Sequence, residues 1–198
     1  MGRRNVLKTL LSTAVITNLF CGSKPATPPP YLDIEEFYKT LGHLWIIATA
    51  TATGQASTAC KFYDVTSVKD GKVYFGRIFY RNGTRVEKQL TGILTGEKHP
   101  VVAQLMKYNN VMRVQPSDEN LFEERLLYQS RGRECGVFNV RSISHGVQVS
   151  SEFFELRLWN SSAVSPYKEC LKAYAERVPN GKVITTYYNP LCKNILTT

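Results

Sequence analysis

Histidine is scarce in this sequence, and the motifs of common enzymes are missing from it. Only three histidines occur among 198 residues, and His43, His99 and His145 are too far apart for the usual spacing of metal ligands. There is no Gly-x-Ser-x-Gly motif and no glycine-rich phosphate-binding loop. The sequence therefore gives no indication of an enzyme, a cofactor or a metal site.

Long apolar runs are missing beyond the first 23 residues, so no later segment is predicted to span a bilayer. The N-terminus itself has basic residues, then an apolar run over 10–20, then small residues, which is typical of a secretory signal. A membrane anchor is the alternative, but the run is short for one. We therefore expect a secreted protein with a signal peptide (1–23), a proline-rich leader (24–32) and one domain (33–198).

Cysteine pairs of the Cys-x-x-Cys type are absent, which argues against zinc binding and thioredoxin-like redox chemistry. One of the five cysteines, Cys21, belongs to the predicted signal, so an even number remains. An even number in an exported chain indicates disulfides, and four cysteines allow three pairings. The four are Cys60, Cys135, Cys170 and Cys192.

Two Asn-x-Ser/Thr sequons agree with export. Asn82 begins Asn-Gly-Thr between two strand-like segments, where Asn-Gly predicts a hairpin turn. Asn160 begins Asn-Ser-Ser directly after a predicted strand. We expect both asparagines to be exposed at turns and glycosylated.

Short strand-like segments separated by turn signals fill most of the chain. They recur at the regular spacing of an all-β sandwich or barrel, with no βαβ rhythm and with one helix near each end. Consecutive hairpins favour an up-and-down barrel of about eight strands, which has room for one small ligand. The expected helices are 33–41 and 165–178, and the strand-like segments are 43–53, 60–68, 72–80, 84–95, 101–108, 111–115, 122–129, 136–140, 152–159 and 183–188.

Several of these segments carry residues in the order seen in one family, the tick salivary lipocalins of the histamine-binding-protein group, and the sequence resembles that family over nearly all of residues 33–198. The residues that carry the resemblance are Trp45, Cys60, the segment 135–138 (Cys-Gly-Val-Phe), the segment 154–156 (Phe-Glu-Leu), Cys170 and Cys192. The Gly-x-Trp motif of lipocalins is not strict here, because two residues separate Gly42 from Trp45.

The resemblance implies an all-β, lipocalin-type antiparallel barrel with a short N-terminal helix and a C-terminal helix. It implies disulfides that join Cys60 to Cys192 and Cys135 to Cys170. It also implies a salivary protein, similar to the japanin-like branch, that dampens the immune or inflammatory response of a host. A long-range disulfide of this kind is worth about 4–5 kcal/mol in the chain-entropy model.

The amine binders of the family place acidic residues inside the barrel, because a buried ammonium needs a paired carboxylate. Glu155 and Glu87 match such positions. Arg157, however, is two residues from Glu155, shares its strand face and can pair with it. Strand alternation places Glu87 on the outside, so both acids also have a purely structural interpretation.

An interior that is poor in acids suits an apolar ligand, and the leading hypothesis is a secreted carrier of a sterol, fatty acid or eicosanoid. One alternative is a scavenger of histamine or serotonin that uses the two acids. Another is an immunomodulator with an incidental pocket that binds the surface of host immune cells or sulfated glycans through basic residues near the hairpin, such as Arg77, Arg81 and Arg85. We see no nucleic-acid-binding motif. The predicted ligand-binding residues are Trp45, Phe75, Glu87, Phe153, Glu155 and Arg157.

Overall fold

The computed structural model describes most of the chain after the leader. The predicted signal peptide, the predicted strand at 101–108 and Asn160 lie outside the described residues. The described residues are 32–54, 58–95, 109–116, 121–143, 149–159 and 164–196.

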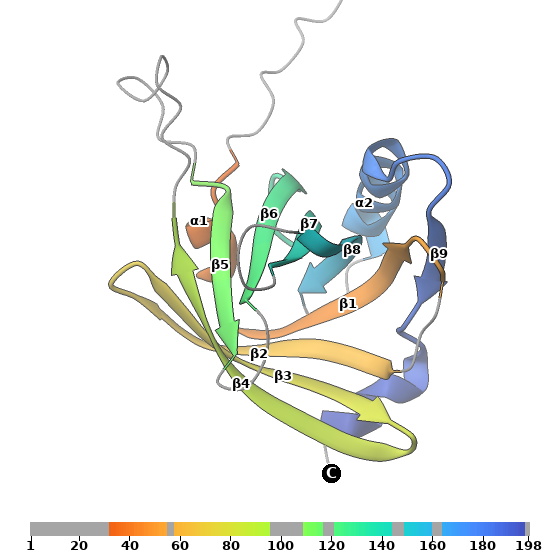
Figure 1. Cartoon of the computed structure of the whole chain (residues 1–198), viewed down its shortest axis with the longest axis horizontal. Helices are drawn as coiled ribbons and strands as arrows, with labels where there is room; N and C mark the ends of the chain where they lie inside the picture. Colours follow the sequence, from red (N-terminus) through yellow and green to blue (C-terminus); the bar gives the residue numbers. More distant parts are fainter. Residues whose placement is uncertain are drawn as a thin grey trace, which may run out of the picture.

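Eight antiparallel strands form a closed barrel, which confirms the predicted fold (Figure 1). Each strand from β2 to β7 pairs with the next one along the chain, β8 pairs with β1, and the β1–β2 pairing closes the ring. A ninth strand pairs with the last residues of β1, on the edge opposite β8 and beyond the part of β1 that pairs with β2. The strands are β1 (Gly42–Thr51), β2 (Ala59–Lys69), β3 (Lys72–Arg81), β4 (Thr84–Leu94), β5 (Val111–Pro116), β6 (Leu121–Gln129), β7 (Cys135–Ile143), β8 (Val149–Trp159) and β9 (Val183–Thr186).

Two α-helices and one 3₁₀-helix complete the described structure: α1 (Ile34–Tyr38), α2 (Val164–Arg177) and η1 (Pro190–Leu196). The Asp33 side chain caps α1 by accepting a hydrogen bond from the Glu36 backbone N–H at 3.1 Å. The sequence did not predict η1. No helix in the described part of the chain is long and apolar enough to cross a membrane.

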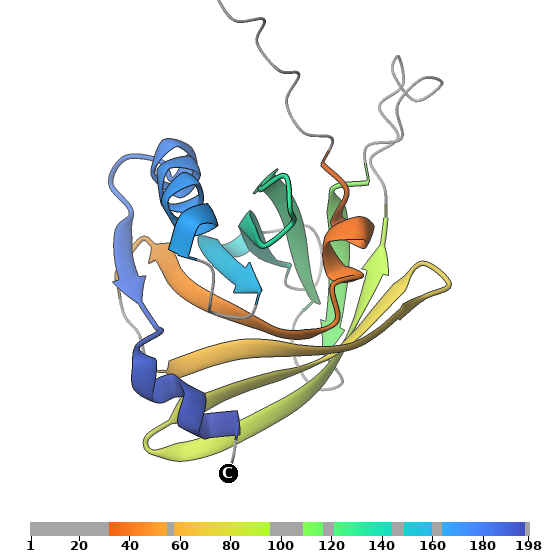
Figure 2. The ribbon, with the colours of Figure 1, turned by 180° about the vertical axis from the view of Figure 1, so that it is seen from behind.

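Alternation along the strands separates an inner from an outer apolar cluster. The inner cluster fills the barrel next to α1, where Phe37 contacts the rings of Phe138 and Trp159 at 5.3 and 5.8 Å between centroids. The outer cluster lies between the barrel wall and the C-terminal helices α2 and η1. Figure 2 shows α2 and η1 on the outside of the barrel from behind. Because α1 covers one end of the barrel, we call the opposite end, with the β3–β4 turn at Asn82, the far end.

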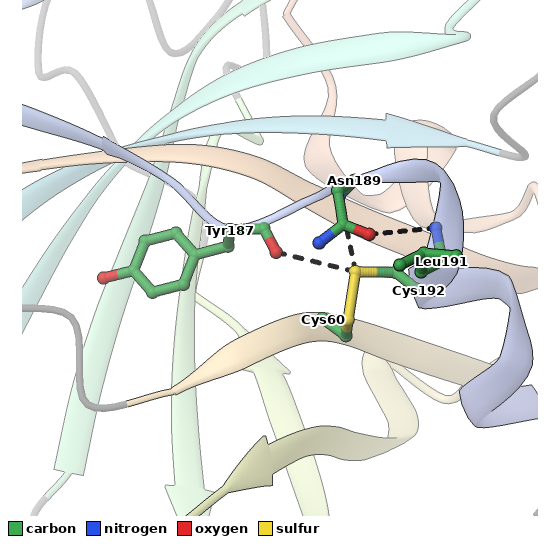
Figure 3. The surroundings of a disulfide bond; sticks show 5 residues. All are labelled: Cys60, Tyr187, Asn189, Leu191 and Cys192. Atoms are coloured by element: carbon green, nitrogen blue, oxygen red, sulfur yellow. Dashed lines mark hydrogen bonds between the residues drawn. A yellow bond between two sulfur atoms is a disulfide. The ribbon is translucent and has the colours of Figure 1, made fainter. Parts of the chain in front are cut away.

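Two disulfides hold the C-terminal segments against the barrel, with the pairing that the resemblance implies. Cys135 is joined to Cys170 of α2, and Cys60 of β2 is joined to Cys192 of η1. In Figure 3, the turn before Cys192 is held by the Asn189 side chain, which accepts a hydrogen bond from the Leu191 backbone N–H at 2.9 Å. The Cys60–Cys192 bond spans 132 residues and so ties the last described segment to an early strand.

A register shift in β1 changes which of its residues face inward. Leu44 and Ile46 belong to the inner cluster, but the β1–β8 pairing shifts between Ile46 and Ala48. Trp45 lies on the outside, packed on Phe62 in the outer cluster with 4.6 Å between ring centroids. The expectation that Trp45 lines the interior is therefore wrong.

Candidate functional site

The barrel interior contains a buried ion cluster centred on Arg157. This guanidinium makes a bidentate ion pair with Glu124, with Nη1–Oε2 and Nη2–Oε1 distances of 2.6 and 2.9 Å. Its Nη2 also lies 2.6 Å from Oε2 of Glu155, and all three side chains are fully buried. The predicted Arg157–Glu155 pair is thus confirmed, and Glu124 is a second partner that the sequence analysis missed.

Two buried tyrosines supply further hydrogen bonds to the cluster. The hydroxyls of Tyr38 and Tyr63 donate to opposite oxygens of Glu124, at 2.9 and 3.2 Å. The guanidinium of Arg157 also stacks near the rings of Phe138 and Tyr63, 4.1 and 4.7 Å from their centroids. Burial raises the pKa of Tyr38 well above its usual value, so this hydroxyl keeps its proton.

Glu155 is held from its other side by Lys61, whose Nζ lies 2.8 Å from Oε1. Burial alone would raise the pKa of Glu155, but the charges of Lys61 and Arg157 lower that pKa to about 2. Burial lowers the pKa of Lys61, an effect that the Glu155 carboxylate opposes. Both oxygens of this carboxylate are therefore engaged within the protein.

Arg77 of β3 adds another cation to the interior. Its Nη2 donates to the Tyr63 hydroxyl at 3.2 Å, and its guanidinium lies 5.3 Å from the ring centroids of Tyr63 and Phe122. Its Nε is buried and has no hydrogen-bond partner among the described residues. The hypothesis of a basic outer surface is therefore wrong for Arg77, which points inward.

The other predicted site residues divide between the two sides of the wall. Phe75 is inside and packs on Tyr63 with 4.8 Å between centroids, and Phe153 is inside and half-buried. Glu87 is exposed on the outside, where it accepts a hydrogen bond from Arg85 at 2.9 Å. The structure therefore brings Phe75, Phe153, Glu155 and Arg157 together but excludes Glu87 and Trp45.

Strand alternation could have identified one of the residues that the sequence analysis missed. Glu124 lies midway between Phe122 and Leu126 at a spacing of two, and all three face inward. The contributions of Tyr38 and Lys61 had no such signal, because their partners lie 86 and 94 residues away in the sequence.

No protein-family model matches the sequence, and no curated protein matches it. The similarity to solved structures concerns the fold. Lobster apocrustacyanin A1 superposes with a TM-score of 0.53 at 12% identity, covering 78% of this chain and 79% of that one. The siderocalin Ex-FABP superposes with a TM-score of 0.53 at 8% identity, covering 75% of this chain and 93% of that one. A deswapped triple mutant of bovine odorant-binding protein superposes with a TM-score of 0.50 at 11% identity, with the same coverage of 75% and 93%. The chain therefore has the lipocalin fold.

Proposed function

We propose that this protein is a secreted lipocalin that binds a small hydrophobic molecule inside its barrel and modulates the immune or inflammatory response of a host. The ligand classes that fit are a sterol, a fatty acid or an eicosanoid. The host-directed role is supported by the resemblance to the tick salivary lipocalins, and the binding role by the barrel interior.

The observation that carries the binding proposal is the difference between the two halves of the interior. Next to α1, inward side chains such as Phe37 and Phe138 are fully buried. On the far side of the ion cluster, the inward rings of Phe122 and Phe153 are only half-buried. Aromatic rings that face inward yet keep accessible surface are suited to cover an apolar ligand.

The interior offers little to a biogenic amine. An ammonium needs a carboxylate that is not already neutralised, and both oxygens of Glu155 and of Glu124 accept bonds from side chains of the protein. Glu87, the other acid that could serve an amine, lies outside the barrel. The amine-scavenger alternative therefore has no support from the described residues.

Secretion is supported by the N-terminal sequence, by the two disulfides and by the position of one sequon. Asn82 is exposed at the β3–β4 turn, with φ of 50°, and Gly83 follows with φ of 78°. We include a glycan on Asn82 in the proposal. By its name, one structural neighbour binds odorants, and another is described as having dual ligand specificities, which gives precedents for ligand binding by this fold.

Native mass spectrometry of the purified secreted protein, followed by titration with cholesterol and oleyl alcohol, tests the proposal. We expect a bound lipid, or saturable one-to-one binding of at least one probe, and no binding of histamine or serotonin. Phe153→Ser should weaken probe binding, whereas Val183→Ser, at a β9 residue that is 48% exposed, should not. Binding of histamine with rejection of every apolar probe would overturn the proposal.

A further inference from the structure

The charged side chains inside the barrel do not balance. Among the described residues of the ion cluster and its immediate neighbours, Lys61, Arg77 and Arg157 are cations, and only Glu124 and Glu155 are anions. In this group, the cations exceed the carboxylates by one.

The unbalanced charge can be assigned to Arg77. Glu124 is engaged by Arg157 and two tyrosines, and Glu155 by Arg157 and Lys61. Among the described residues, Arg77 contacts only the Tyr63 hydroxyl and two aromatic faces, and its buried Nε has no partner there. The carboxylates of Glu124 and Glu155 act on it from farther away, without an ion pair at hydrogen-bond distance. A cation removed from water is costly unless an anion and hydrogen-bond acceptors compensate it.

Arg77 is also accessible, unlike the centre of the cluster. Arg157, Glu124 and Glu155 are fully buried, but the side chain of Arg77 is only half-buried. Phe122 precedes Glu124 by two residues on β6, so its ring lies one layer nearer the far end, and the Arg77 guanidinium contacts this ring. Arg77 therefore lies where the ion cluster meets the half-buried aromatic rings.

We infer that the ligand is a long-chain carboxylate, a fatty acid or an eicosanoid acid, whose head group pairs with Arg77 while its chain lies along Phe122 and Phe153. This rests on the proposed carrier function and narrows its ligand class. A carboxylate supplies the missing negative charge and hydrogen-bond acceptors for the guanidinium of Arg77. A sterol offers only a hydroxyl, and an amine has the wrong sign of charge.

Equilibrium dialysis of delipidated protein with tritiated oleic acid and tritiated oleyl alcohol at pH 8 tests the inference, because the two probes share the same chain. We expect the acid to bind about 10- to 100-fold more tightly, as for a hydrogen-bonded charge pair. Arg77→Met should remove most of this difference by weakening acid binding, with alcohol binding changed by less than about threefold. Leukotriene B4, tested in parallel, distinguishes an eicosanoid from a fatty acid.

The matched control is Arg113→Met, which removes the same charge from an exposed position on β5 and should leave both affinities unchanged. Arg77→Gln gives the same comparison should the methionine variant fail to fold. Equal affinity for acid and alcohol, or acid binding that survives both Arg77 substitutions, would overturn the inference and leave the carrier function intact. If cholesterol, the alcohol and both acids all fail to bind, the carrier function itself is wrong.

Discussion

Replacing Arg157 by methionine should strongly destabilise the barrel. Methionine keeps an unbranched apolar side chain between the rings of Phe138 and Tyr63, so the change mainly removes the charge. Glu124 then keeps only tyrosine hydroxyls as partners, while Glu155 still has Lys61. One fully buried carboxylate is therefore left without a cation.

Leaving a buried charge uncompensated typically costs about 3–5 kcal/mol, because the ion has lost both its water and its partner. For a domain of this size, each kcal/mol lowers the melting temperature by roughly 2–4 °C. The Arg157→Met variant should therefore melt roughly 6–20 °C below the wild type.

Urea denaturation followed by circular dichroism, with the disulfides intact, measures this loss directly. Arg141→Met is the matched control, because Arg141 pairs with Glu152 at 3.1 Å on a partly exposed face, where such pairs contribute about 0–1 kcal/mol. Adding Glu124→Gln to Arg157→Met should recover part of the loss, because the orphaned charge is gone. If Arg157→Met alone has a free energy of unfolding within about 1 kcal/mol of the wild type, the buried ion cluster is refuted.

Two further predictions concern acid stability and the long-range disulfide. The pKa of Glu155 is lowered to about 2, so its contribution of about 3 kcal/mol is fully present above pH 4.5 and is lost as the pH falls toward 2. In the Glu155→Gln variant, the urea midpoint should depend less on pH between pH 4.5 and 2 than in the wild type. An unchanged pH dependence would contradict the lowered pKa of Glu155. Replacing both Cys60 and Cys192 by alanine should lower the free energy of unfolding by about 5 kcal/mol, because this disulfide closes a loop of 132 residues. Removing the Cys135–Cys170 disulfide, which spans 35 residues, should cost only about 4 kcal/mol. Urea unfolding in which the loss of Cys135–Cys170 is the more costly would contradict this order.

The elements of the fold were predictable because their signals are local. The turn at Asn82 follows from Asn-Gly, whose two residues adopt the positive φ values that a tight hairpin needs. The cap at Asp33 likewise follows from the residues next to it. The disulfide pairing was different, since geometry could not be read from spacing and only the resemblance selected one of three pairings.

Which side chains point into the barrel was harder to predict, because one extra residue in a strand reverses the alternation between inward and outward side chains after it. In β1, Trp45 and Thr49 are four positions apart and should share a face in a regular strand. The register shift after Ile46 places Thr49 opposite the inward Glu155, whereas Trp45 pairs with the outward Leu158. A bulge of this kind depends on the neighbouring strand, so the sequence of β1 alone did not indicate it.

The ion cluster also bears on why the interior carries charge at all. A buried ion pair is usually no more stable than apolar residues of the same volume, so folding alone does not require Arg157 and its carboxylates. Their mutual compensation nevertheless makes the cluster tolerable, since each carboxylate oxygen has a donor. Arg77 has no ion pair at hydrogen-bond distance among the described residues: the carboxylates of Glu124 and Glu155 act on it from farther away, and its buried Nε has no partner. If the inferred ligand is right, the acidic head group of that ligand, rather than the fold, accounts for a cation at this position.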